Sequence, residues 1–204
     1  MTGDLSSVPL AILLDDLASE SPAPGGGTAS ALAGAMAAAL VAMVARLSLA
    51  KEVAAPRDEL KRLLIEAEER RRRLLALAGQ DAQAYLGVLT AYRLPKQTPA
   101  EKTLRSEAVG VALSQAAQVP LEVAGIAVEL VDAAEYLGRE GYPAAATDAE
   151  VAVWLARAAA RGALANVEVN LKSMRASPER ESLRDQAQAL TARCCADSGP
   201  PGRG

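Results

Sequence analysis

The sequence contains no histidine and no phenylalanine, and only one tryptophan and four tyrosines among its 204 residues. Without histidine, the chain cannot form a Ser-His-Asp or Cys-His catalytic pair, a histidine-ligated zinc or haem site, or a histidine general base. Acid–base chemistry must therefore come from Asp, Glu, Lys, Tyr or the backbone. Since aromatic residues favour strands, their scarcity also argues against a β-sheet protein.

Cysteine is equally scarce, and its placement excludes further classes of site. Cys194 and Cys195 are adjacent, which gives neither a disulfide framework nor the spacing of metal ligands. We therefore expect a cytoplasmic protein with no metal or redox cofactor. The net charge of −3 argues against nucleic acid as the main partner. The N-terminus carries Asp4 and no basic residue, so we expect no secretory signal.

One uncharged segment is long enough to cross a bilayer, Ala23 to Ala45. It consists mostly of alanine and glycine, follows an acidic stretch and lacks an aromatic belt. We therefore interpret it as a buried helix of a soluble protein and expect no membrane partner.

The residues that are abundant favour helices. Alanine makes up about a fifth of the chain, with many leucines, glutamates and arginines. Start and stop signals predict helices over residues 9–18, 28–50, 56–93, 98–137, 147–176 and 177–195. The fourth and fifth would begin with capping boxes, Thr98–Glu101 and Thr147–Glu150, and Pro120 should kink the fourth.

This pattern predicts an all-α fold, an antiparallel bundle of five to six helices, two of them very long, in one domain over residues 1–196. A Gly/Pro-rich disordered tail would follow over residues 197–204. Small residues recur at helical spacing over residues 29–38. Because such faces let backbones approach closely, we expect a homodimer built on them.

Gly25, Gly26 and Gly27 lead into Thr28 at the predicted start of the second helix. Backbone amides and the helix dipole can bind an anion at such a place. A tight connection between closely packed helices explains the same glycines. The segment is neither a phosphate loop, which would continue with Gly-Lys-Ser/Thr, nor a dinucleotide fingerprint, because no strand precedes it.

Two aspartates are candidates for acid–base chemistry. Asp81 lies among small and apolar residues, with Tyr85 one turn further along the same helix face. A carboxylate in a dry site has a raised pKa and can exchange protons near neutral pH; a solvated surface aspartate is the alternative. Asp148, beside Thr147, would lie in the first turn of a helix, where the dipole alone favours an acidic residue.

Asn166 and Asn170 are one helical turn apart, although asparagine is a poor helix former. Their amides could bind the edge of a heterocycle or the backbone of another helix. Arg93 and Lys96 could hold a carboxylate or complement the end of a helix. Arg70 to Arg73 follow several glutamates by about one turn, so we expect a solvated, ion-paired face rather than a basic patch.

Five segments occur in the order of the motifs of one known family: Ser21–Ala31, Asp81–Tyr85, Arg93–Lys96, Thr147–Asp148 and Gly162–Leu171. Together they resemble the cyclodeaminase domain of formiminotransferase-cyclodeaminase, a family that includes stand-alone methenyltetrahydrofolate cyclohydrolases. The departures keep the functional groups: Thr28 and Thr147 stand where serine is usual, and Val169 where isoleucine is usual.

The resemblance implies an all-α homodimer that acts on a tetrahydrofolate carrying a one-carbon unit. It favours Asp81 as the catalytic carboxylate, with Asp148 as second choice. Asn166 and Asn170, with Tyr85 nearby, would orient the pterin ring. Lys96 and the loop Gly25–Thr28 would hold anionic groups such as the glutamate tail.

Two reactions of this family fit the resemblance. We favour hydrolysis of 5,10-methenyltetrahydrofolate to 10-formyltetrahydrofolate, because it needs no partner transferase and 204 residues leave no room for one. The alternative is the formimidoyltetrahydrofolate cyclodeaminase reaction, which releases ammonia. A non-catalytic helical module that binds folate or another anion is a further possibility.

Overall fold

The computed structural model describes residues 8–196, with side chains placed as far as Cys194. Within these bounds every regular element is helical, which confirms the predicted fold class. The elements are α1 (Leu10–Leu17), α2 (Gly26–Leu49), α3 (Arg57–Arg93), α4 (Pro99–Glu140), the 3-10 turn η2 (Pro143–Ala145), α5 (Ala146–Ser173) and α6 (Pro178–Ala196). The predicted disordered tail, residues 197–204, lies outside the described residues.

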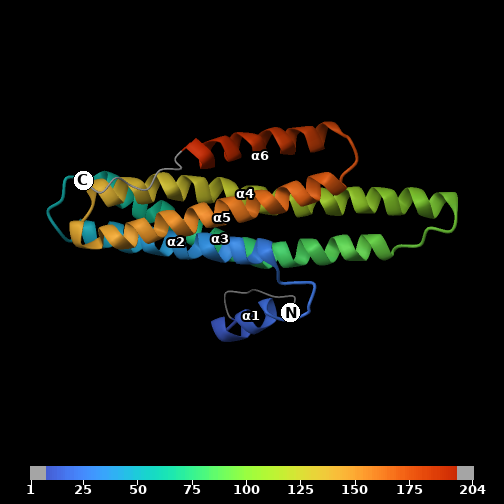
Figure 1. Ribbon diagram of the computed structural model, residues 1–204, viewed down its shortest axis with the longest axis horizontal. Helices are drawn as coiled ribbons and strands as arrows, with labels where there is room; N and C mark the ends of the chain where they lie inside the picture. Colours follow the sequence, from blue (N-terminus) through green and yellow to red (C-terminus); the bar gives the residue numbers. More distant parts are fainter. Residues whose placement is uncertain (1–7, 197–204) are drawn as a thin grey trace.

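Helices α2 to α5 form an antiparallel bundle, in which α2 packs against α3, α4 and α5 (Figure 1). α6 covers one side of α4 and α5, and α1 stands apart from the long helices on the side of α2. The two predicted very long helices are confirmed: α3 has 37 residues and α4 has 42. Figure 1 shows them running on together past the point where α2 begins.

Small residues allow the helices of this bundle to pack closely within one chain. A Cβ atom built on Gly34 of α2 would lie 3.2 Å from Leu74 Cδ1 of α3 and 3.5 Å from Ala159 Cβ of α5. Ala37 and Ala38 have no exposed surface. The expectation that these faces form a homodimer interface is therefore wrong for Gly34, Ala37 and Ala38, because the same chain already buries all three.

Of the two predicted capping boxes, the first is confirmed. The Thr98 side chain accepts a hydrogen bond from the Glu101 N–H, and the Glu101 side chain accepts one from the Thr98 N–H. The second is wrong: α5 begins at Ala146, and Thr147 makes no capping hydrogen bond. The turn η2 runs directly into α5, so its backbone takes the place of a side-chain cap; the N–H of Ala146 donates to the Pro143 carbonyl.

α4 continues through Pro120 without a break and ends at Glu140, three residues beyond the predicted end at Leu137. Gly141 ends the helix, and a side chain there would overlap the Leu137 carbonyl oxygen. The buried Ser48 hydroxyl at the end of α2 accepts a hydrogen bond of 2.9 Å from the Tyr142 N–H. This bond fixes the end of α4 beside the end of α2.

The arginines of α3 belong to an ion-paired face, as predicted. Arg70 contacts both Glu66 one turn earlier and Glu129 of α4. Arg71 pairs with Glu68 of its own helix. Arg73 reaches across to Glu122 of α4 instead of pairing along α3. The face therefore also joins α3 to α4, which the helical spacing alone did not predict.

By length and composition, α2 and α4 each contain a window apolar enough to cross a membrane. In the structure 50% of the α2 window and 61% of the α4 window are buried inside the bundle. The apolar character of both helices therefore has an explanation in the packing of this chain.

Candidate functional site

The first turn of α2 holds the carboxylate of Asp81, which projects from α3. The Thr28 hydroxyl donates to Asp81 Oδ2 over 3.0 Å, and the Thr28 backbone N–H also bonds to this carboxylate. Gly27 lies directly against the carboxylate, because a Cβ built on Gly27 would overlap its atoms. Two residues that are 53 positions apart in sequence thus meet at the end of a helix.

This arrangement changes the role expected for the glycine loop. The free N–H groups and the dipole at a helix N-terminus favour an anion. Here the anion is the protein's own Asp81 carboxylate, so Gly27 and Thr28 contact a side chain of α3. Gly25 is the N-terminal cap of α2 with an extended backbone, and a Cβ built on it would have no neighbour within 4 Å.

The surroundings of Asp81 set its protonation equilibrium. Burial raises the pKa of the Asp81 carboxyl above its ordinary value, and the two hydrogen bonds from Thr28 act against this shift. Among the described residues, no charged side chain contributes to this pKa. A partly buried carboxylate without a cationic partner can exchange protons and can stabilise a positive charge brought to it.

Asn166 of α5 borders the same turn. Its Nδ2 lies 3.7 Å from the position of a Cβ on Gly26, and it donates to the Gly162 carbonyl over 2.8 Å. Ser30 donates to the Gly26 carbonyl over 2.8 Å, and a side chain at position 162 would overlap the Ser30 hydroxyl. Gly162 therefore allows α5 to approach the first turns of α2, and Asn166 is brought to the site.

Asn170 has a different environment. Its Nδ2 donates to the Ala116 carbonyl of α4 over 2.8 Å and to the Asn166 carbonyl over 3.0 Å. In a regular helix the N–H of residue 120 would reach the Ala116 carbonyl, but residue 120 is proline and has no N–H. Asn170 thus satisfies the carbonyl that Pro120 leaves free. Of the two possibilities raised by the sequence, the backbone of another helix is the one observed for this amide.

Tyr85 lies one turn beyond Asp81 on α3, and 44% of its surface is exposed. Because Asp81 contacts the first turn of α2, Tyr85 lies one turn beyond this contact along α3. Asp81, Tyr85, Asn166 and the turn Gly26–Thr28 are therefore the predicted site residues that the fold brings to one end of α2.

Two predicted residues lie elsewhere in the chain. Lys96 follows the end of α3, about 20 Å along the helix axis from Asp81. It lines a cleft of about 950 Å³ between the α3–α4 hairpin and the α5–α6 connection, together with Lys102 and Arg175. Asp148 lies in the first turn of α5, near the far end of α2, about 30 Å from Asp81.

Three contributors to the site were absent from the predicted site residues: Ser30, Gly162 and the Ala78 carbonyl, which lies 3.3 Å from the Thr28 hydroxyl. Ser30 and Gly162 stand inside the segments that resemble the family, so the signal was present. The Ala78 carbonyl is a backbone group of a regular helix, and no side-chain pattern marks it.

The helical bundle with its partly buried Asp81 carboxylate is a domain of the cyclodeaminase type. The family model described as formiminotransferase-cyclodeaminase matches residues 9–189, and the chain belongs to this family.

Relatives of two kinds match the chain. A methenyltetrahydrofolate cyclohydrolase from Methylorubrum extorquens is 42% identical over 165 residues, which cover 79% of this chain and 78% of that protein. The formimidoyltransferase-cyclodeaminase of Rattus norvegicus is 32% identical over 86% of this chain, but the match spans only 32% of the rat protein. The crystal structure of a formiminotetrahydrofolate cyclodeaminase from Thermotoga maritima superposes with a TM-score of 0.83 at 29% identity, covering 93% of this chain and 91% of that one.

Proposed function

We propose that the protein hydrolyses 5,10-methenyltetrahydrofolate to 10-formyltetrahydrofolate, with Asp81 as the acid–base group. The observation that carries the proposal is the Asp81 carboxylate itself, partly buried, raised in pKa and without a charged partner among the described residues. A carboxylate without a cationic partner can stabilise the positive charge of the methenyl substrate. The 42% identity to a cyclohydrolase, against 32% for the rat bifunctional protein, favours hydrolysis.

In this reaction water attacks the methenyl carbon that bridges N5 and N10, and Asp81 accepts one proton from the attacking water. Collapse of the resulting carbinolamine breaks the bond between that carbon and N5. N5 takes up one proton, the carbinolamine hydroxyl loses its own, and a carbonyl remains on N10. One proton is released to solvent, which balances the loss of the positive charge. A carboxylate serves both steps because it accepts a proton in the first and returns it in the second.

The neighbouring residues would position the substrate. Asn166 and Tyr85 flank Asp81 from two helices, and we assign them to the pterin ring. Asn170 would support Asn166, since it donates to the Asn166 carbonyl. Lys96, which shares its cleft with Lys102 and Arg175, would attract the carboxylates of the glutamate tail. Asp148 has no step in this scheme, because about 30 Å separates it from Asp81 within one chain.

The second candidate is the cyclodeaminase reaction, in which N10 attacks the formimino carbon on N5 and ammonia leaves. The relative solved from Thermotoga maritima and its name favour it. The same carboxylate could protonate the leaving nitrogen. The third candidate, a binding module without catalysis, would keep folate affinity when Asp81 is lost.

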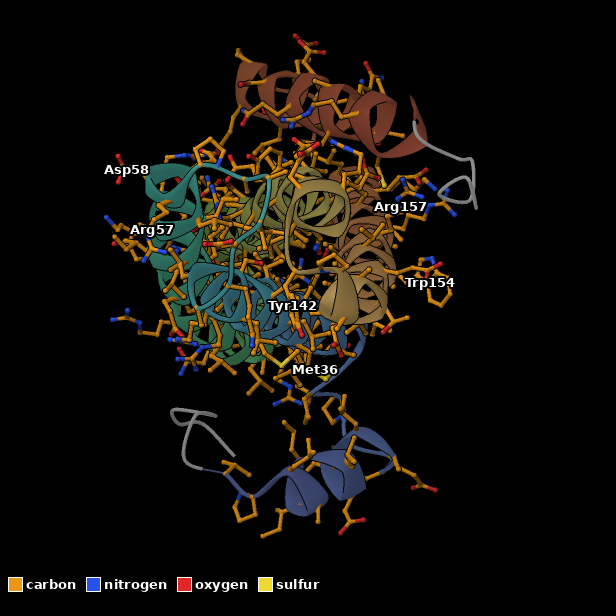
Figure 2. All side chains as sticks on the ribbon, turned by 90° about the vertical axis from the view of Figure 1, so that its left-hand side faces the viewer. Met36, Arg57, Asp58, Tyr142, Trp154 and Arg157 are labelled. Atoms are coloured by element: carbon orange, nitrogen blue, oxygen red, sulfur yellow. The ribbon has the colours of Figure 1, made fainter. Side chains whose placement is uncertain are left out.

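Further properties are part of the proposal. The protein would act in the cytoplasm without a metal or redox cofactor, and without nucleic acid or membrane as a partner. It would form a homodimer through apolar side chains that one chain leaves exposed, such as Met36 of α2 and Trp154 of α5, with 52% and 57% of their surfaces exposed. Figure 2 shows Trp154 projecting away from the bundle and Met36 on the side that faces α1.

The deciding experiment supplies the purified protein with methenyltetrahydrofolate and, separately, with formiminotetrahydrofolate, and follows the absorbance of the methenyl group. Hydrolysis consumes this absorbance and cyclodeamination produces it. Asp81→Asn should lower turnover by about a hundredfold or more. The matched control is Asp58→Asn, which changes an exposed carboxylate of the same helix (Figure 2). Equal turnover in both variants would refute the role of Asp81, and no reaction with either folate would refute the proposed function.

A further inference from the structure

Thr28 is a fully buried hydroxyl between two acceptors on α3. It has no exposed surface, and its Oγ1 lies 3.0 Å from Asp81 Oδ2 and 3.3 Å from the Ala78 carbonyl oxygen. A hydroxyl has one hydrogen to donate and lone pairs that accept. It can therefore point its hydrogen at either acceptor but not fully at both.

The two orientations match the two protonation states of Asp81. When the carboxylate is ionised, the Thr28 hydroxyl donates to it. When Asp81 is protonated, its own O–H can donate to Thr28 Oγ1, and the Thr28 hydrogen turns to the Ala78 carbonyl. In both states every one of these buried groups keeps a partner, which avoids the cost of an unsatisfied polar group. Thr28 itself neither gains nor loses a proton.

Gly27 keeps the carboxylate in place during this exchange. Since a Cβ on Gly27 would overlap the Asp81 carboxylate, the carboxylate lies against the backbone of α2. The Thr28 N–H bonds to it from the same turn. A rotation of one hydroxyl is therefore enough to accommodate the proton, and no heavy atom has to move.

We propose that Thr28 is a positioning residue that keeps a hydrogen bond to Asp81 in both of its protonation states. It does so by turning its hydroxyl hydrogen between Asp81 and the Ala78 carbonyl. The proposal rests on the proposed function only for its effect on turnover. It differs from the role first expected of Thr28, which was contact with the substrate.

In the described structure, no charged side chain affects the protonation of Asp81 in place of Thr28. α2 carries no charged residue from Gly26 to Ala45. α5 presents Asn166 to the turn, and α3 presents Tyr85 one turn from Asp81. Among the described residues, burial raises the pKa of Asp81, the two bonds from Thr28 lower it, and no charged side chain contributes.

The test compares Thr28→Val, which keeps the shape and removes the hydroxyl, with Thr28→Ser, which keeps the hydroxyl. The Asp81 carboxyl is titrated by carbon NMR in the substrate-free protein, and its signal is assigned by its loss in Asp81→Asn. Because a hydrogen bond to a charged group contributes about 1.5–3 kcal/mol, Thr28→Val should raise the midpoint by about one pH unit or more. Thr28→Ser should return it to the wild-type value.

The pH profile of turnover supplies the second readout. Thr28→Val should lower turnover by about tenfold or more and move the acidic limb upward, while Thr28→Ser restores both. If Thr28→Val does not fold, Thr28→Cys, whose thiol is a weak donor, should give an intermediate upward shift. An unchanged NMR midpoint in the folded variant that lacks the hydroxyl overturns the proposal. The NMR titration decides even if neither folate is turned over, so failure of the proposed function would be seen separately.

Discussion

The hydrogen bond from Asn170 to the Ala116 carbonyl should stabilise the fold because Pro120 has no N–H to donate to that carbonyl. A double-mutant cycle can measure this coupling between positions 120 and 170. Ala116 is buried, with 6% of its surface exposed, so solvent cannot replace a lost donor fully. In Asn170→Ala the Ala116 carbonyl loses the side chain that reaches it. Leaving a buried acceptor unsatisfied costs about 1–3 kcal/mol, and we expect Asn170→Ala to reduce the free energy of unfolding by that amount.

The Pro120→Ala background should remove most of this cost. Alanine at position 120 has an N–H that can donate to the Ala116 carbonyl in the ordinary helical pattern. Asn170→Ala made in this background would leave no orphaned carbonyl. We therefore expect a coupling energy of about 1–2 kcal/mol between positions 120 and 170. Pro120→Ala alone combines a gain in helix propensity with a loss of buried packing, and the cycle cancels both.

The assay is urea unfolding of the wild type, the two single variants and the double variant at one fixed protein concentration, because association would shift apparent stability. The matched control is Asn166→Ala in both backgrounds. Asn166 donates to the Gly162 carbonyl, which keeps its regular helical partner, so no coupling with position 120 is expected. Effects of Pro120→Ala and Asn170→Ala that add within about 0.5 kcal/mol would refute the reasoning.

Three other predictions concern the site and the assembly. The raised pKa of Asp81 disfavours its ionised form in the folded state, so the contribution of Asp81 to stability should fall as the pH rises from the ordinary pKa through the raised pKa. Over that pH range the melting temperature of Asp81→Asn should rise relative to that of the wild type, and a constant difference would contradict this. Gly27→Ala should displace the Asp81 carboxylate and reduce turnover by about tenfold or more, whereas Gly125→Ala, with open space at its Cβ, should leave turnover unchanged; a fully active Gly27→Ala would show that the close approach is dispensable. Sedimentation should give a dimer that Trp154→Glu weakens, and a 21.1 kDa species at micromolar concentration would contradict the homodimer.

The helical fold follows from the sequence because it depends on local chemistry. Helix propensity and the Thr98–Glu101 capping box act within a few residues, so composition and spacing report them. The absence of histidine leaves carboxylates as the main acid–base groups, and small neighbours made Asp81 a candidate; its catalytic role stays a prediction. At Thr147 the sequence predicted a second capping box, but tertiary context overrode it, because the backbone of η2 made a side-chain cap unnecessary.

The contacts of Asp81 and of Asn170 depended on tertiary structure alone. Thr28 and Asp81 are 53 residues apart, and Asn170 and Ala116 are 54 apart, so neither pair shares a local pattern. Glycine before a helix predicts an anion, but only the packing of α2 on α3 decides that the anion is a carboxylate of the same chain. An asparagine in a helix predicts a polar partner, but only the antiparallel register of α4 and α5 places that asparagine beside the carbonyl freed by a proline. Hydrogen bonds act over about 3 Å, and the distances between helices are set by the packing of the whole bundle.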